Sequence, residues 1–418
     1  MAKVITTELQ HAGASAANIT LDSSKNVTCE NNLQVDGNVT VTGTLPADKL
    51  TGNLPAISGA NLTGISTPAS FRNVIINGAM QISQRGTSET GISSAGAFRK
   101  APDRFKFSVD DGTWTASQDS SGPPGFANSY KVDCTSADTS IAAGNEVKLD
   151  TKLEGQDLQH FCKGTSSAKK FCLQFWVKSN KTGNYAVQMR DQDNTRHVCH
   201  LYTISSADTW EQKKIVFPAD TTGAFGDDNL NSLTINWYLS VGTNKTSGTM
   251  DTAWASVTDA NIAAGHNVNL ADSTSNYLNL TGVQLEAADA CTDFEHKLYG
   301  DELRRCQRYF WQLIDYNNTS IAIGSIYSGS DLMWVNHFPV TMRASPSIRS
   351  NINGSGSFII GRWHNATGGT NGSGNINIQR VNKNTILVYS TGWSLPEPGA
   401  VSLESNTSSC YLGYEAEL

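Results

Sequence analysis

Apolar and polar residues alternate in short stretches along most of the chain, and the shortest stretches lie near its beginning. A unit of the form apolar-x-apolar-x-Gly-x starts at Leu33 and is repeated from Val39. The alternation places the apolar side chains on one side of short strands, and each glycine permits a bend or a close backbone approach. A second repeat, Leu-Thr-Gly, occurs at 50–52 and again at 62–64. The pattern predicts an extended β-repeat segment over residues 31–75.

These repeats carry too few large apolar side chains to form a core within one chain. Three copies wound about a common axis would pool their apolar faces and pair their exposed strand edges. Because repeat units need neighbours to be stable, the pattern favours a homotrimeric stalk. A flexible linker rich in Gly and Thr is the alternative.

Longer alternating segments follow in the middle of the chain. They predict strands at 171–177, 185–190, 214–217, 233–239 and 279–286. The polar run 178–183, which ends in glycine, predicts a hairpin turn after the first of these strands. Many short strands with turn signals between them and no helical period predict an antiparallel β-sandwich over residues 76–298.

Residues 300–311 form the best helix candidate. Asp301 can cap this helix. One apolar face with the spacing 3, 4, 3 is formed by Leu303, Cys306, Phe310 and Leu313. The basic residues Arg304, Arg305 and Arg308 are either a binding group for an anionic sugar or phosphate or a solvated helix face. Beyond the helix, alternation predicts strands at 320–327, 334–340 and 386–389, which indicates a small distal β domain.

The composition supports an all-β class and excludes some partners. Only 17% of the 418 residues are charged, against roughly 25% in an average soluble domain, and 36 Gly together with many Asn, Ser and Thr residues are typical of turn-rich β proteins. The net charge of −7 argues against nucleic acid or anionic lipid as a partner. No apolar run has the length of a membrane span, and residues 1–10 contain no apolar signal segment, so we expect no membrane insertion. The eight widely spaced cysteines predict mostly reduced, buried thiols.

Several segments of the sequence resemble those of bacteriophage tail fibres, and they are most similar to the fibres of short-tailed marine phages. VDGNVTVTGTL and RNVIINGAMQISQRG are similar to the N-terminal and neck segments of such fibres. FWVKSNKTGNYAVQMRDQDN, ADTWEQKKIVFPADT and LTGVQLEAADACTDFEHKLYGDEL resemble their jelly-roll domain, which is similar to carbohydrate-binding modules. ELRRCQRYF and FPVTMRASPSI resemble the start of the receptor-facing domain, and the similarity fades after about residue 350.

The resemblance implies a division of the chain into four parts. Residues 1–30 are expected to attach to a tail adaptor or nozzle protein, and residues 31–75 to form the trimeric stalk and neck. Residues 76–298 are expected to form the jelly-roll domain, and residues 299–418 the distal domain that binds the host receptor. The protein is expected in the tail of the virion, after synthesis in the host cytoplasm.

Candidate catalytic and metal-binding residues are few. Asp191 and Asp193 are spaced like paired carboxylates on one strand face, but they fall in a polar run that favours a solvated loop. His197 and Cys199 suggest zinc, but on a strand His200 points away from both and no fourth ligand is apparent. We therefore expect neither an enzyme nor a cofactor. Calcium bound by Asp and Asn oxygens of loops is left open.

Recognition of sugars calls for aromatic faces and for amide or carboxylate partners of hydroxyl groups. The candidates for glycan binding lie in the distal domain: Tyr327, Trp363, His364, Asn365 and Trp393. Trp334 lies within a predicted strand and is expected in the core.

The sequence thus predicts an elongated homotrimeric fibre that attaches a virion to a host surface polysaccharide or lipopolysaccharide. Weak sites repeated in each fibre would supply avidity. Two alternatives stay open: a tailspike that depolymerises polysaccharide with carboxylates that meet across subunits, and a purely structural head fibre or connector.

Overall fold

The computed structural model describes residues 71–93, 100–314, 320–328, 331–350, 358–362, 370–372, 375–391, 400–405 and 411–418, together with three short strands before residue 30. The chain divides into two compact units, Met1–Pro68 and Ala69–Leu418. In the first unit, β1 (Glu8–Leu9), β2 (Ile19–Leu21) and β3 (Val27–Cys29) form a small antiparallel sheet. The repeats at 33–64 lie outside the described residues, so the trimeric stalk stays a prediction.

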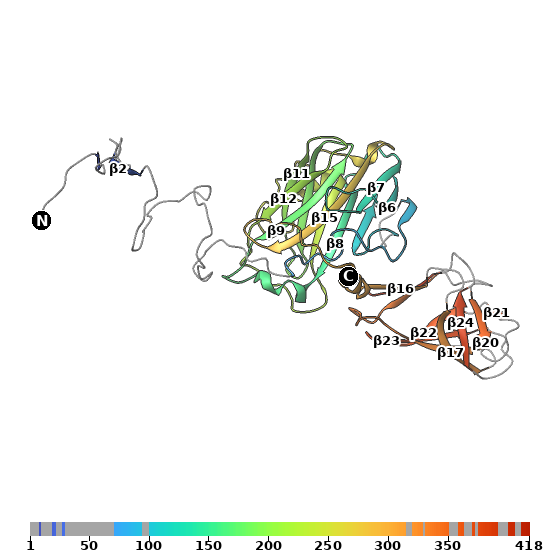
Figure 1. Cartoon of the computed structure of the whole chain (residues 1–418). Helices are drawn as coiled ribbons and strands as arrows, with labels where there is room; N and C mark the ends of the chain where they lie inside the picture. Colours follow the sequence, from blue (N-terminus) through green and yellow to red (C-terminus); the bar gives the residue numbers. More distant parts are fainter. Residues whose placement is uncertain are drawn as a thin grey trace. The chain divides into compact units, whose positions relative to one another are not determined.

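The second unit begins with a sandwich of two antiparallel sheets that lie face to face (Figure 1). Neighbouring strands of the first sheet are, in order, β14 (Ala255–Ser256), β11 (Arg196–Ile204), β10 (Gly183–Asp191), β13 (Asn231–Val241), β8 (Glu146–Glu154) and β5 (Phe105–Val109). Those of the second sheet are β12 (Glu211–Phe217), β9 (Phe171–Ser179), β15 (Tyr277–Ala287), β7 (Ser129–Ser136), β6 (Thr113–Asp119) and β4 (Ser88–Ile92). The predicted all-β class and the antiparallel sandwich are confirmed.

Alternation along the strands produces the core of the sandwich. In β9, Phe171, Leu173, Phe175 and Val177 point toward the facing sheet and are fully buried. In β13, the residues Leu233, Ile235, Trp237 and Leu239 do the same from the other side. Large side chains from both sheets therefore fill one continuous apolar layer, and the alternate residues are left on the two outer faces.

The predicted hairpin after β9 is wrong. β9 pairs with β12 and β15, whereas β10 pairs with β11 and β13 in the other sheet. The chain does reverse at 180–182, but it crosses from one sheet to the other instead of pairing with itself. The turn residues determine where the strand ends, and the apolar faces of both strands decide which sheet each one joins.

The distal β domain consists of two further antiparallel sheets. The smaller one contains β16 (Phe310–Ile314), β25 (Leu412–Glu415) and β19 (Ser347–Ser350). The larger one contains, in order, β21 (Thr370–Gly372), β20 (Phe358–Arg362), β24 (Ala400–Ser405), β17 (Ser320–Ser328), β18 (Asp331–His337), β23 (Thr385–Thr391) and β22 (Asn375–Val381). Trp334 is buried in the core between them, as expected, and its Nε1 donates to Asn336 Oδ1 at 3.0 Å.

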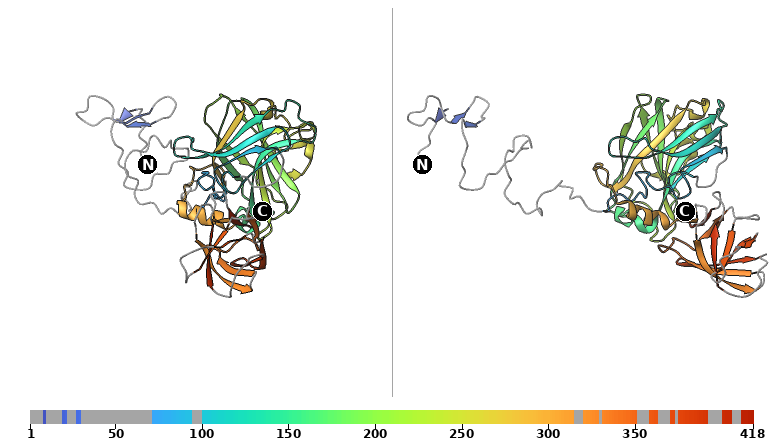
Figure 2. Two further views of the ribbon diagram at one scale, coloured as in Figure 1. Left: turned by 90° about the vertical axis from the view of Figure 1, so that its right-hand side faces the viewer. Right: turned by 45° about the vertical axis from the view of Figure 1, so that its right-hand side comes forward.

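One α-helix, α1 (Tyr299–Gln307), precedes these sheets and lies at one end of the sandwich (Figure 2). It is shorter than predicted, because Phe310 and Leu313 belong to strand β16. Leu298, not Asp301, is the N-cap residue. The prediction was right for Leu303 and Cys306, which pack against Ile76 and Ile82 at the start of the unit. Short 3-10 turns occur at Gly155–Asp157, Gln159–Phe161, Thr243–Lys245, Asp259–Asn261 and Leu270–Asp272.

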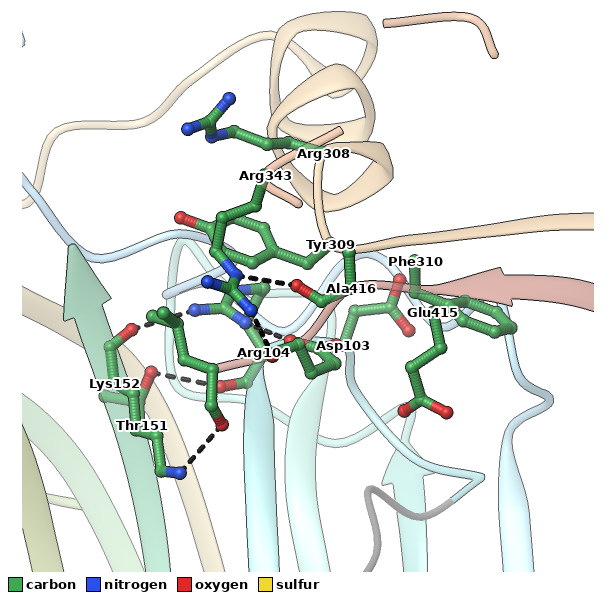
Figure 3. A network of polar contacts seen from close by, with 12 residues as sticks. Asp103, Arg104, Thr151, Lys152, Arg308, Tyr309, Phe310, Arg343, Glu415 and Ala416 are labelled. Atoms are coloured by element: carbon green, nitrogen blue, oxygen red, sulfur yellow. Dashed lines mark hydrogen bonds and ion pairs between the residues drawn. The ribbon is translucent and has the colours of Figure 1, made fainter. Parts of the chain in front are cut away.

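A buried polar network joins the C-terminal segment to the sandwich (Figure 3). The Arg104 guanidinium forms an ion pair with Glu417, donates to the carbonyl oxygen of Lys152 at 2.8 Å and stacks on the ring of Tyr309 at 3.4 Å. Arg85 also bonds to Glu417, at 2.9 Å, and its guanidinium lies 3.7 Å above the ring of Phe310. The chain end is therefore bonded to residues that precede it by more than 300 positions.

The cysteines only partly follow the prediction. Cys134, Cys199 and Cys306 are free and buried, and Cys162 is free and half-buried. Cys172 in β9, however, forms a disulfide with Cys291, with Cα atoms 5.3 Å apart. Cys172 points away from the core, and the segment after β15 covers this outer face, since Gln174 Nε2 also donates to the carbonyl oxygen of Thr292 at 2.9 Å. The disulfide thus ties this covering segment to the sheet.

Among the described residues, no helix has the length and apolar character needed to span a membrane.

Candidate functional site

A polar cleft of about 440 Å³ lies on the outer face of the sheet that runs from β5 to β14. Its floor is made of the residues that alternate with the core residues on four adjacent strands. β5 contributes Lys106 and Ser108; β8 contributes Glu146, Lys148, Asp150 and Lys152; β13 contributes Thr234, Asn236 and Tyr238; β10 contributes Gln188 and Arg190, and Gln192 follows directly after β10. One wall comes from the loops that carry Lys245, Asp259 and Ile262. The cleft is thus a direct product of strand periodicity on one face of a sheet.

The strand register arranges the floor in rows. Lys106 lies opposite Asp150, which lies opposite Asn236, which in turn lies opposite Gln188. In the next row toward the ends of β8 and β10, Lys152 faces Thr234 and Thr234 faces Arg190. Amide, carboxylate and cationic side chains therefore lie next to one another on neighbouring strands, which are about 4.8 Å apart.

Gln188 is held in place by a buried hydrogen-bond network. Its Oε1 accepts from Asn236 Nδ2 at 3.0 Å and from the Tyr238 hydroxyl at 2.9 Å. Its Nε2 lies 3.0 Å from His197 Nδ1, and His197 Nε2 lies 2.9 Å from Asp251 Oδ2. Because the Gln188 amide donates to Nδ1, His197 carries its proton on Nε2 and donates it to Asp251. Gln188 and its neighbours in the floor are therefore held in place, because their hydrogen-bonding groups already have partners within the protein.

The same hydrogen-bond network includes His197, one of the residues that suggested zinc. His197 and Cys199 share a face of β11, with Sγ and Nδ1 3.7 Å apart, while His200 is exposed on the opposite face, as predicted. Both ring nitrogens of His197 are engaged in hydrogen bonds. Within the part of the chain that the structure describes, no three His, Cys, Asp or Glu side chains are grouped so that they could hold a metal ion.

Asp150 is the most unusual group on the floor. Its side chain is only 4% exposed, and its Oδ1 has no hydrogen-bond partner among the described residues. Burial raises the pKa of this carboxyl group, although Lys148, Lys106 and Lys152 act in the opposite direction. A buried acceptor without a donor is costly unless a ligand or water supplies one. We therefore expect a ligand in the cleft to place a hydrogen-bond donor against the Asp150 carboxylate.

Glu146 differs from Asp150, because its charge is fully compensated. It forms ion pairs with Lys148 and, at 3.2 Å, with Lys245. Burial acts to raise the pKa of Glu146, but the two ammonium groups outweigh it, and the pKa is lowered. Glu146 is a structural anion that fixes two lysines at the edge of the cleft.

Tyr238 is the aromatic residue among those that line the cleft. It is 2% exposed, and Lys148 Nζ lies 5.7 Å from its ring centroid. The ring is thus covered and does not offer a flat face to a ligand. Recognition in this cleft must rest on hydrogen bonds and charge rather than on stacking.

The glycan-binding candidates predicted from the sequence are not tested by this structure. Trp363, His364, Asn365 and Trp393 lie outside the described residues, and of Tyr327 the structure describes the backbone in β17 but not the side chain. They stay predictions. The cleft was missed, although its signal is visible in the segment Glu146–Glu154, where charged residues alternate with Val147, Leu149, Thr151 and Leu153.

The interpretation of Asp191 as a solvated loop residue is wrong. Asp191 ends β10 and is fully buried, with its Oδ2 2.5 Å from Lys163 Nζ. Lys163 Nζ also lies 3.0 Å from Asp220 Oδ2 and donates to the carbonyl oxygens of Thr222 and Gly223. These four oxygens are of the kind that calcium prefers, and here an ammonium group occupies the space between them.

The basic cluster of the helix has separated roles. Arg308 binds Glu154 of the sandwich through two hydrogen bonds of 2.9 and 2.7 Å, so it is a structural cation rather than an anion site. Arg304 is 70% exposed and pairs with Asp301 at 3.3 Å, as a solvated helix face predicts.

No family model and no curated protein matches this chain. Among solved structures, the enzymatically active domain of tailspike protein 4 of bacteriophage CBA120 is 13% identical over 52% of this chain, with a TM-score of 0.26, and the chain covers 22% of that protein. A putative sugar-binding protein from Bacteroides thetaiotaomicron is 14% identical over 52% of this chain and 100% of that one, with a TM-score of 0.27. A family 11 carbohydrate-binding module from Clostridium thermocellum, in complex with a β-1,3-1,4-mixed-linked tetrasaccharide, is 11% identical over 50% of this chain and 99% of that one, with a TM-score of 0.24. At these TM-scores the likenesses carry no functional argument, so function is argued from the cleft itself.

Proposed function

We propose that this protein attaches to a cell-surface polysaccharide and that the cleft over β5, β8, β13 and β10 is its saccharide-binding site. The observation that carries the proposal is the buried carboxylate of Asp150, whose Oδ1 has no hydrogen-bond partner among the described residues, in a floor rich in amides, hydroxyls and cations. Saccharides present many hydroxyl groups, each of which can donate and accept, so they suit such a floor. The resemblance of the sequence to phage fibres further favours a tail fibre that binds a polysaccharide or lipopolysaccharide of its host.

We propose binding without catalysis. Glycosidases place two carboxyl groups within about 5 to 10 Å of each other. Asp150, the acid with an open hydrogen-bonding position, is four residues from Glu146 on β8, which corresponds to about 13 Å along a strand. The other two acids that line the cleft are Asp259 and Asp110, and Asp110 lies beside Glu146, since its Oδ2 accepts from the Glu146 N–H at 3.1 Å. Glu146 is in addition bound to Lys148 and Lys245.

The full-length protein is expected to bind a subset of glycans on an array and to release no reducing ends from the polysaccharide that it binds. Asp150→Ala is expected to weaken binding about tenfold or more, because a hydrogen bond to a charged group is lost. Asp227→Ala, which removes an exposed acid from a bend and is not among the residues that line the cleft, is the matched control and should bind like the wild type. Release of reducing ends would favour the depolymerase instead. A loss of binding in Trp363→Ala but not in Asp150→Ala would place the site in the distal domain.

We also propose that the chain is a homotrimer, since the repeats over residues 31–75 need neighbours. Light scattering in solution is expected to give three times the chain mass of 44.9 kDa. A mass of one chain would contradict the trimer and leave the repeats as a linker.

A further inference from the structure

The charges of the cleft do not balance. Glu146 is bound by Lys148 and Lys245, which leaves Asp150 as the anion on the floor between β5 and β10. Three cations lie around it on the neighbouring strands: Lys106, Arg190 and Lys152, of which Lys152 already donates to the carbonyl oxygen of Leu418 at 2.7 Å. Counting Asp110 and Asp259 at the edges, the cleft is lined by five basic and four acidic side chains, a surplus of one positive charge within a protein whose net charge is −7.

Of the cations in the cleft, Arg190 is the one best suited to bind a ligand. It forms no ion pair with a described carboxylate, and its Nε is buried without a hydrogen-bond partner. It is half-buried on β10, opposite Thr234, so its position is fixed by the sheet. A guanidinium group matches the planar geometry of a carboxylate and binds it through two parallel hydrogen bonds.

Asp150 and Arg190 together set the size of the ligand. They are separated by one intervening strand, β13, and by one row of the register. Neighbouring strands lie about 4.8 Å apart, so the two backbone positions are about 10 Å or more apart. A ligand that contacts both groups is therefore an oligosaccharide segment rather than a single sugar. The covered ring of Tyr238 provides no stacking platform for a neutral sugar face.

We propose that the cleft selects an acidic polysaccharide, in which a sugar carboxylate pairs with Arg190 while a hydroxyl group of the same segment donates to Asp150. This inference rests on the proposed saccharide-binding function. It specifies the substrate class, because an uncharged glycan would leave the Arg190 guanidinium desolvated without an anion.

The test measures binding of the full-length protein to a panel of uronic acid polymers and to the same polymers after reduction of their carboxyl groups to alcohols. The variants are Arg190→Gln and the matched control Lys214→Gln, which removes one exposed cation from β12 in the other sheet. The wild type should bind at least one uronate about tenfold more tightly than its reduced form, and high salt should narrow the difference. Arg190→Gln should remove this preference and leave the affinity for the reduced polymer unchanged. Lys214→Gln should keep the preference.

The possible outcomes separate this inference from the function on which it rests. Equal affinity for the acidic and reduced polymers, or binding of neutral glycans alone, overturns the acidic class but leaves saccharide binding intact. An equal loss of both affinities in Arg190→Gln shows that Arg190 supports the sheet rather than the ligand, and it also overturns the inference. Binding of a sulfated dextran with no binding of uronates would overturn the inference that the cleft recognises a sugar carboxylate, because the anion bound would be of another kind. Failure to bind glycans of any kind overturns the proposed function itself.

Discussion

Replacing Lys163 by methionine is expected to lower the free energy of unfolding by about 3 to 5 kcal/mol. The Lys163 side chain is completely buried, and its ammonium group lies 2.5 Å from Asp191 and 3.0 Å from Asp220. Methionine fills a similar volume but leaves Asp191 charged and buried without a cation, while Asp220 keeps its ion pair with Arg196. Removing one partner from a buried ion pair is costly for this reason. Urea unfolding of both proteins at neutral pH measures the difference.

Lys170→Met is the matched control for this substitution. Lys170 is half exposed and pairs with Asp289 at 3.1 Å on the surface, so its loss should change the stability by less than about 1 kcal/mol. Adding Asp191→Asn to Lys163→Met should recover part of the loss, because it removes the uncompensated charge. If the double variant is as unstable as the sum of the two single changes, packing rather than charge explains the effect.

Replacing Arg104 by methionine is expected to cost about 3 to 5 kcal/mol and to loosen the C-terminal segment. The guanidinium group is 2% exposed and has contacts with Glu417, with the Lys152 carbonyl oxygen and with the Tyr309 ring, so three interactions are lost together (Figure 3). Arg85 still binds Glu417, which limits the loss. Hydrogen exchange at residues 411–418 and urea unfolding measure the two effects.

Arg304→Met provides the comparison, since Arg304 is 70% exposed and forms a single surface pair. It should change neither the stability by more than about 1 kcal/mol nor the exchange of the C-terminal segment. If Arg104→Met lowers stability but residues 411–418 exchange as slowly as before, the ion pair is not what holds this segment to the sandwich.

The strands of the sandwich were largely predictable, because period-2 alternation is a local property. The predicted strands at 171–177 and 233–239 lie within β9 and β13, where one face is entirely apolar. The helix was predicted too long for a related reason. Phe310 and Leu313 continue the spacing of its apolar face, but their segment forms strand β16, whose backbone hydrogen bonds go to β25 instead of to a further helical turn. Because β25 lies about 100 residues further along the chain, the local sequence does not reveal this pairing.

Contacts between distant segments were not predictable. The Cys172–Cys291 disulfide spans 119 residues, and Lys163 meets Asp191 and Asp220 from three separate segments. Widely spaced cysteines and an aspartate in a polar run have the same local sequence whether they are exposed or paired. Their state depends on which segments the sheets bring together.

The sequence by itself determined that the chain is a β protein, where most of its strands lie and that charged residues alternate along Glu146–Glu154. Only the tertiary structure decided that these charges form the floor of a cleft. The register of β5, β8, β13 and β10 aligns Asp150 with Lys106, Asn236 and Gln188, and the loops that carry Lys245, Asp259 and Ile262 add one wall. The physical reason is that periodicity assigns a side chain to a face, whereas strand order and register, which arise from contacts far apart in the sequence, assign its neighbours.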